Sequence, residues 1–236
     1  MTLLAVVKAV CSVVGVEQPT SVFSNIIANR TMQEMLDLAN EMAQRIAYDN
    51  REWTLFRNVG TLVGDGTTTA FPLPVNFKRM LLTTNLWRST SALTPMRFIV
   101  DFDDWNNRRQ LNIYSGYGEW TIYGGNIVIA PVLATGQTAT YGYLDKNCID
   151  LNSGGFGDSF QSDSDGFRLD ERLLKLGMIW QWKSQKGAAY NEELGTYSDA
   201  MAVAMGSDSP GPIYIGRQTV SSATKIAYPF GPVPTP

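Results

Sequence analysis

The side chains that could do chemistry in this sequence are mostly carboxylates, because the chain of 236 residues contains no histidine. Histidine is the side chain whose ordinary pKa lies nearest neutrality, and it is the base of Ser-His-Asp and Cys-His mechanisms and a common metal ligand. Mechanisms of these kinds are therefore excluded. Chemistry based on carboxylates alone or on lysine remains open.

Residues 163–166, Asp-Ser-Asp-Gly, are spaced like part of a calcium loop. An EF-hand loop needs acidic or amide ligands at positions 1, 3 and 5, glycine at position 6 and glutamate at position 12. When Gly166 takes position 6, Gln161 falls first and Arg172 twelfth, so both end ligands are wrong. The pattern instead predicts an acidic loop before a helix, where negative charge complements the helix dipole. We expect no metal and no cofactor.

A second acidic cluster, Asp101, Asp103 and Asp104, surrounds Phe102 and Trp105. A glycosidase needs two carboxylates at a fixed separation across a cleft, and neighbouring positions in a sequence do not supply that separation. The cluster therefore favours a solvated strand end or turn.

Four other features are explained more simply by structure than by chemistry. Residues 154–157 are rich in glycine but lack the strand-to-helix setting and the Lys-Ser/Thr pair of a phosphate loop. The pair Arg108-Arg109 is too small for a nucleic-acid patch. Aromatic residues of the central region could line a sugar-binding face, although core packing accounts for them. Cys11 and Cys148 suggest neither a disulfide framework nor a zinc site, and Cys11 is expected in packing. We propose no catalytic residue and expect a protein that is not an enzyme.

Charge and hydropathy exclude two further classes of partner. The net charge of −3 gives no electrostatic footprint for gripping DNA or docking on an anionic membrane. The apolar run over residues 2–14 has no basic segment before it, is interrupted by Lys8 and ends at Gly15, too short for a membrane span. The sequence therefore predicts neither export nor membrane insertion.

Helical periodicity at both ends of the chain predicts the elements that must position these residues. Residues 2–14 have Thr2 as a candidate N-cap and Gly15 as a stop, and residues 32–48 follow a candidate capping box over 31–34. Periodicity returns after residue 167 and predicts one helix face formed by Leu169, Leu173, Leu176 and Trp180. Gly177 would allow another helix to approach closely. A last helix from about Asn191 should present Leu194, Tyr197, Met201 and Met205 on one stripe.

The central region reads as a β module of about six strands. Residues 62–69 predict a strand, a tight turn and a second strand, and residues 122–129 predict a hairpin whose glycines supply a positive φ. The expected fold class is therefore α+β. A discontinuous helical bundle (1–58 and 168–205) carries an inserted antiparallel β module (59–150), followed by a polar loop (151–167) and an extended C-terminal arm (206–236).

The segment 206–236 is rich in proline and serine, which is typical of a disordered tail. It also carries large apolar groups, for which a solvated tail has no use because each contributes about 1.5–3 kcal/mol when buried. We favour an arm that becomes ordered along a neighbouring subunit. Its candidate partner-binding residues are Ile213, Tyr214, Ile215, Val220, Ile226, Tyr228 and Phe230.

The order of these features resembles the head-to-tail adaptor, or connector, proteins of tailed bacteriophages, the tail tubular protein A-like family. The resemblance covers most of the chain. It rests on four stretches, namely Val14-Gly15-Val16 with Leu38–Glu41 and Arg51–Leu55, Phe71–Arg79 (FPLPVNFKR), Trp120–Pro131 (WTIYGGNIVIAP) with Ala134–Gln137, and Leu169–Lys183 (LDERLLKLGMIWQWK) with Lys186-Gly187 and Tyr190. The sequence departs from the family at Val75, where a small polar residue is frequent, and at 130–133, which is less proline-rich. Residues 206–236 carry none of the family's motifs.

This resemblance implies a structural virion protein. A ring of twelve copies would dock beneath the portal protein, contact a tail or nozzle protein, and continue the channel through which double-stranded DNA passes without specific binding. The protein would reside in the neck of the virion, and in the host cytoplasm during assembly. The alternative from the residues alone is a tail or baseplate binding module that recognises surface glycan.

Overall fold

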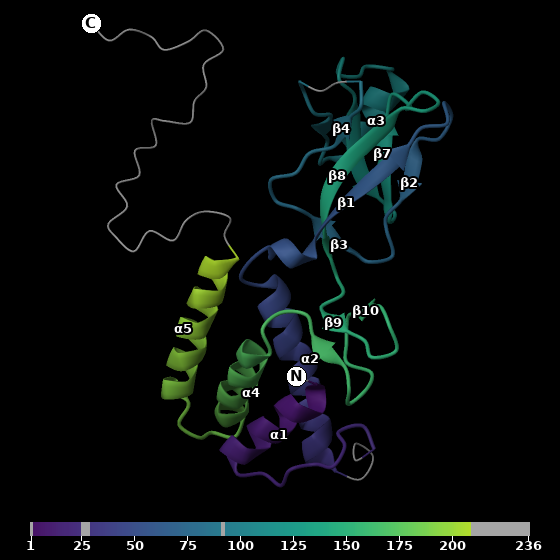
Figure 1. The fold of residues 1–236 in the computed structure, drawn as a ribbon. Coiled ribbons are helices and arrows are strands. Elements are labelled where there is room, and N and C mark those ends of the chain that lie inside the picture. The colour runs from purple at the N-terminus through teal and green to yellow at the C-terminus, as the bar shows by residue number, and fades with distance from the viewer. Residues whose placement is uncertain (1, 25–28, 91–92, 209–236) are drawn as a thin grey trace, which may run out of the picture.

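The computed structural model describes residues 2–24, 29–90 and 93–208. The chain is an α+β protein in which a group of helices and a β module lie end to end (Figure 1). Among the described residues, no helix combines the length and the apolar character needed to cross a membrane.

The helical part begins with α1 (Leu3–Val14) and α2 (Arg30–Tyr48). The Thr2 hydroxyl accepts a hydrogen bond from the Ala5 N–H, and Gly15 ends α1 at a φ of 75°, so both predicted caps of this helix are confirmed. The predicted capping box at residues 31–34 is wrong. Asn29 caps α2 instead, since its side chain accepts the N–H of Thr31, and Glu34 pairs with Arg30 and Lys186.

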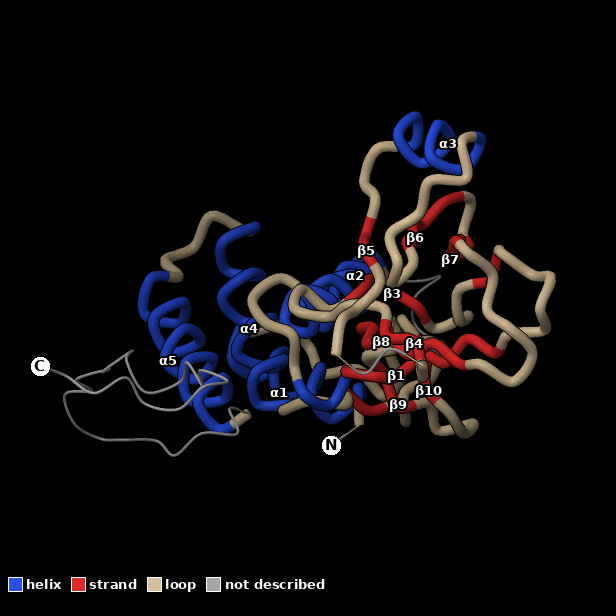
Figure 2. Tube along the Cα trace, turned by 90° about the horizontal axis from the view of Figure 1, so that it is seen from above, coloured by secondary structure: helices blue, strands red, loops and turns tan. Residues whose placement is uncertain are grey.

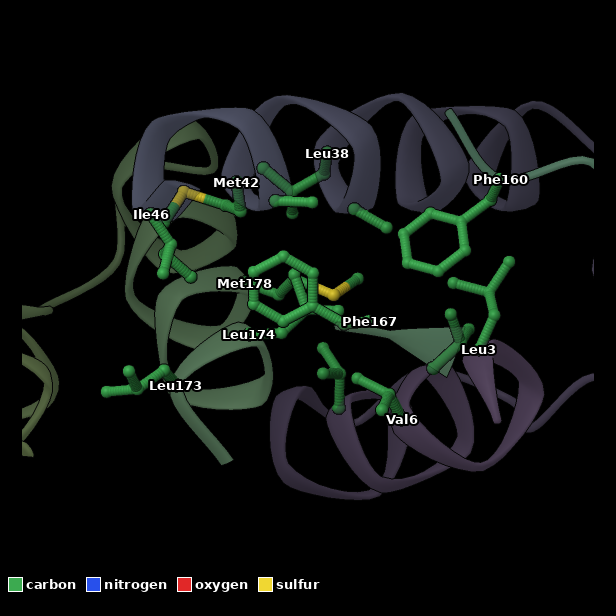
Figure 3. Close-up of a cluster of buried hydrophobic side chains, with 14 of the residues drawn as sticks. Leu3, Val6, Leu38, Met42, Ile46, Phe160, Phe167, Leu173, Leu174 and Met178 are labelled. Carbon is green, nitrogen blue, oxygen red and sulfur yellow. The ribbon is translucent and has the colours of Figure 1, made fainter. Parts of the chain in front are cut away.

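Helix α4 (Glu171–Gln185) lies at the centre of the helical part and packs against α1, α2 and α5 (Asn191–Ser207). A cluster of buried side chains from α1, α2 and α4, together with Phe160 and Phe167, fills the space between them (Figure 3). The single apolar face predicted for α4 is too narrow, because three neighbouring helices bury more of its surface. Its buried residues are Leu173, Leu174, Gly177, Met178, Ile179 and Trp182, whereas Leu169, Leu176 and Trp180 are half-buried.

Two predictions about these helices are confirmed. Gly177 faces α2 so closely that a Cβ there would lie 2.5 Å from Cε of Met42. Tyr197 and Met201 of α5 are buried against the same core. Figures 1 and 2 both place α5 outermost, beside α4.

The β module contains two four-stranded sheets that share a core. A short 3-10 helix, η1 (Thr54–Phe56), leads directly into the first sheet. This sheet has the strand order β1-β8-β3, and β4 also pairs with β8. Its strands are β1 (Arg57–Val63), β3 (Phe77–Met80), β4 (Trp87–Arg88) and β8 (Thr138–Asp145). The second has the order β2-β7-β6-β5, formed by β2 (Ala70–Pro72), β5 (Arg97–Phe98), β6 (Glu119–Tyr123) and β7 (Asn126–Ala130). Leu62, Tyr141, Trp120 and Ile127 meet between the sheets.

The hairpin predicted at residues 122–129 is confirmed as β6 and β7, joined through Gly124 and Gly125, both at positive φ. The strand and the turn predicted at 62–69 are confirmed, since β1 ends at Val63 and a turn follows at Asp65. The second strand, β2, begins only at Ala70, and it pairs with β7 in the other sheet while β1 pairs with β8. The Asp65 carboxylate accepts the N–H groups of Thr67 and Thr68 and shapes the turn between them. The module is not wholly antiparallel either, since β5 runs parallel to β6.

The segment between the β module and α4 is more structured than the predicted polar loop. It contains β10 (Phe156–Gly157) and β11 (Gly166–Phe167), which flank β9 (Ile149–Asp150) in a small antiparallel sheet. The backbone oxygens of Asp163 and Asp165 accept the N–H groups of Leu4 and Leu3. This segment therefore holds the beginning of α1 in place.

Candidate partner-binding surfaces

The acidic stretch at residues 163–166, which was expected to lead directly into a helix, is separated from α4 by β11 and binds backbone N–H groups. The Asp165 side chain is 1% exposed, and its two oxygens accept the N–H groups of Asn152 at 2.9 Å and of Gln161 and Ser162 at 2.7 Å. The Asp163 carboxylate accepts the N–H of Val22 at 2.8 Å. Oxygens that accept several N–H groups are already satisfied. The described residues contain no group of acidic, cysteine or histidine side chains arranged to hold a metal ion.

The second acidic cluster lies at the start of a helix that was not expected from the sequence, α3 (Phe102–Gln110). Asp101 is its N-cap and accepts the Asp103 N–H, while Asp104 pairs with Arg108 at 2.9 Å. The prediction of a strand end or turn is therefore wrong. The signal was present, because an aspartate before two acidic and two basic residues matches the charge preference of helix ends. Arg108 also pairs with the buried Glu119 at 3.2 Å, and Trp105 packs α3 on the sheet.

Both cysteines are buried, as is typical of packing residues rather than nucleophiles. Burial raises the pKa of the Cys11 thiol, and burial raises the pKa of Cys148 to about 11. The glycines at 154 and 155 adopt positive φ and form the turn between β9 and β10.

The joint between the two parts of the molecule is built from ion pairs. Glu52, after α2, pairs with Arg79 of β3, and Arg168 pairs with the buried Asp145 at the end of β8. The Arg168 guanidinium also lies over the rings of Phe56 and Phe156, at 5.1 and 3.9 Å from their centroids. Paired charges and stacked rings at both connections tie the β module to the helices.

A groove runs between the outer helix α5 and the beginning of α4. It has a volume of about 720 Å³, and buried Trp53 and Leu173 contribute to its lining. Ala200, Val203 and Ala204 line it from α5, and Val203 is 73% exposed. This surface was not predicted from the sequence. Its signal is a second apolar strip on α5, beside the strip of Tyr197 and Met201 that faces α4.

The distal edge of the β module carries a set of exposed aromatic residues. Phe102 and Tyr123 stack with ring centroids 4.4 Å apart and are 41% and 59% exposed. Phe98 lies 4.6 Å from Trp120, centroid to centroid, and is 44% exposed. The other aromatic residues of the module considered in the sequence, such as Trp120, Tyr141 and Tyr143, are buried in its core.

The seven residues predicted to bind a partner, Ile213 to Phe230, lie outside the described residues. Their role stays a prediction. The described chain ends at Asp208, which is held by Arg51 at 3.0 Å and by the N–H and hydroxyl of Thr54. The point at which the arm leaves the helical part is thus fixed by three groups beside the groove.

These features define an α+β protein with an open groove beside α5 and exposed aromatic residues on its β module. No model of a known protein family matches the chain, and no curated protein matches it.

Proposed function

We propose that this protein is a structural adaptor of a tailed bacteriophage, one copy of a ring that joins the portal to the tail. The observation that carries the proposal is that helices from both ends of the described chain pack into one bundle. Helices α1 and α2 pack with α4 and α5 around one core, and the β module projects from this bundle. This arrangement was predicted from the helical periodicity at both ends of the chain, and it gives a ring-forming subunit one body for contacts between copies.

Three of the stretches that resemble the family overlap helices and strands of the structure, which supports the proposal. The stretch Leu169–Lys183 covers most of the central helix α4, and Trp120–Pro131 covers most of the β6–β7 hairpin. The stretch Phe71–Arg79 connects the second sheet to the first.

A ring of this protein would be held by contacts between copies rather than by catalysis. A heterologous interface closes into a ring when its rotation divides a full turn. The net charge of −3 suits a channel through which DNA must slide without sticking. The same chain would contact the portal above and a tail or nozzle protein below.

The test is negative-stain electron microscopy of the full chain, alone and mixed with the portal ring encoded in the same genome. We expect an added ring at the tail-facing end of the portal, even where the free protein is a monomer. A portal from an unrelated phage is the matched control and should remain bare. A chain that leaves its own portal unchanged would contradict the proposal.

A second candidate is glycan recognition by the β module, which the exposed stack of Phe102 and Tyr123 favours. Aromatic faces are common platforms for apolar sugar faces, and the carboxylates of Asp101 and Asp103, which flank Phe102 in the sequence, can accept hydrogen bonds from hydroxyl groups. Saturable binding on a glycan array that Tyr123→Ala abolishes, and that the equally exposed Val63→Ala retains, would establish this candidate. An array without signal would remove it.

A further inference from the structure

The groove between α4 and α5 has the dimensions of a short extended peptide. Its α5 wall runs from Thr196 to Ser207, about 16 Å at the rise of an α-helix. Five extended residues span about the same distance. The residues that line the wall recur every three or four positions, so they form one continuous strip.

The lining offers both apolar contact and charge. Leu173 and Trp53 provide apolar surface, with Val203 on the rim. Asp199 stands on its α5 wall, while Asp208 is paired with Arg51, Asp170 caps α4, and Arg172 also contributes to the lining. A peptide with adjacent apolar side chains and a cation would complement such a groove.

Residues 213–217 of the same chain form a segment of this kind, and they follow shortly after Asp208 at the end of the groove. Asp208 lines the end of the groove and is anchored there by Arg51, so the chain continues from that point. Residues 209–212 are Ser-Pro-Gly-Pro, a composition typical of chain reversals. Residues 213–217, Ile-Tyr-Ile-Gly-Arg, follow at once and have the length of the groove.

Charge distinguishes this segment from the rest of the chain. All 22 acidic residues precede position 209, whereas Arg217 and Lys225 lie beyond it. With Ile213 near Asp208, an extended segment running back along α5 would bring Arg217 to the region of Asp199 and Thr196. The pairing of Asp199 in the groove with a segment whose only charged side chain is cationic favours contact within one chain.

We propose that residues 213–217 dock in the groove of their own chain while the protein is free. Docking covers the apolar strip of α5 and also hides the apolar beginning of the arm from premature contacts. Burial in an open groove only narrowly offsets the entropy of ordering, so a partner can displace the segment. This inference concerns the isolated protein and stands whether or not the adaptor proposal holds.

The experiment is limited trypsin digestion of the full chain, with the products identified by mass spectrometry. Cleavage after Arg217 should be about tenfold slower than cleavage after Lys225, because a protease acts on the undocked population. The ratio should not change with protein concentration. Val203→Asp and Ile215→Ser should each bring it close to one, while Val75→Asp, an exposed substitution far from the groove, should leave it unchanged.

Each other result overturns the proposal in a distinct way. Equal cleavage at both sites in the unaltered protein would mean that the segment does not dock. Protection that rises with concentration would assign the groove to the arm of a second copy. Protection that survives both Val203→Asp and Ile215→Ser would place the segment elsewhere. Circular dichroism of each variant checks that the described fold is kept, and none of these readings depends on portal binding.

Discussion

At the scale of single residues, buried polar groups in this protein have structural roles that could be mistaken for chemistry. Asp165 lies in a sequence pattern like that of a calcium ligand, yet its carboxylate accepts three backbone N–H groups. Its own carbonyl accepts the N–H of Leu3 at 2.8 Å. One residue thus orders the segment before α4 and, through its backbone, the beginning of α1.

Replacing Asp165 tests this role. Asp165→Ala leaves three N–H groups without their charged acceptor, so we expect the free energy of unfolding to fall by about 3 kcal/mol or more. Asp170→Ala removes only the N-cap of α4 and should cost about 1 kcal/mol. Urea denaturation followed by circular dichroism measures both. Millimolar Ca²⁺ should leave the melting temperature of the unaltered protein unchanged, and a clear rise would restore the metal hypothesis.

Cys148 gives a prediction for alkaline pH. Burial raises the pKa of its thiol to about 11 from an ordinary value of 9.0. A group whose pKa is raised by folding contributes its full stability below the unfolded pKa, and loses it as the pH rises toward the folded pKa. Between pH 8 and pH 11 the free energy of unfolding should therefore fall by about 2 kcal/mol more in the unaltered protein than in Cys148→Ala. Urea titrations under reducing conditions check this, and equal losses would contradict it.

At the scale of elements, the close packing of α2 against α4 limits the size of the side chain that position 177 can accommodate. Gly177 faces Met42 of α2, whereas a Cβ added at Gly195 of α5 would meet no neighbouring atom within 4 Å. Gly195→Ala should therefore stabilise the protein by about 0.5–1 kcal/mol, through the lower entropy of the unfolded chain. Gly177→Ala should lose that gain to the contact with Met42, and Gly177→Leu should destabilise by about 1–3 kcal/mol. Thermal unfolding of the three variants orders them, and equal effects at both glycines would contradict close packing.

The elements also show how far sequence patterns reach. The four long helices and the β6–β7 hairpin could be predicted, because periodicity, caps and glycine turns are local signals. Helix α3 was missed because it is short and only Trp105 among its side chains is buried, which leaves no apolar stripe. The pairing of β1 with β8 could not be predicted, since a strand finds a distant partner through the shared core and not through its own sequence.

The candidate surfaces were predicted less well than the fold. The groove beside α5 arises where Trp53, the beginning of α4 and the end of α5 come together. Residues so far apart in the sequence give no common pattern. The resemblance to phage adaptors indicated a functional class, and the apolar residues after position 212 pointed to the arm and not to the groove.

At the scale of the whole molecule, we expect the folded body, residues 2–208, and the arm that follows it to have separate roles. The helices and the β module are tied by the pairs Glu52–Arg79 and Arg168–Asp145. The segment after residue 212 also carries large apolar groups, among them Ile213, Ile215 and Phe230. If the arm attaches the protein to the portal, removing the arm should abolish docking on the portal without unfolding the helices and the β module.

Deleting residues 212–236 tests that independence. We expect the truncated protein to keep its circular dichroism spectrum and to melt within a few degrees of the full chain, because α5 remains anchored at Asp208. Docking on the portal should be abolished in the electron microscopy assay. A deletion of residues 232–236 alone, which spares every predicted arm residue, is the matched control and should dock normally. Unchanged docking of the longer deletion would show that the body alone makes the contact, and the arm would then lose its proposed role.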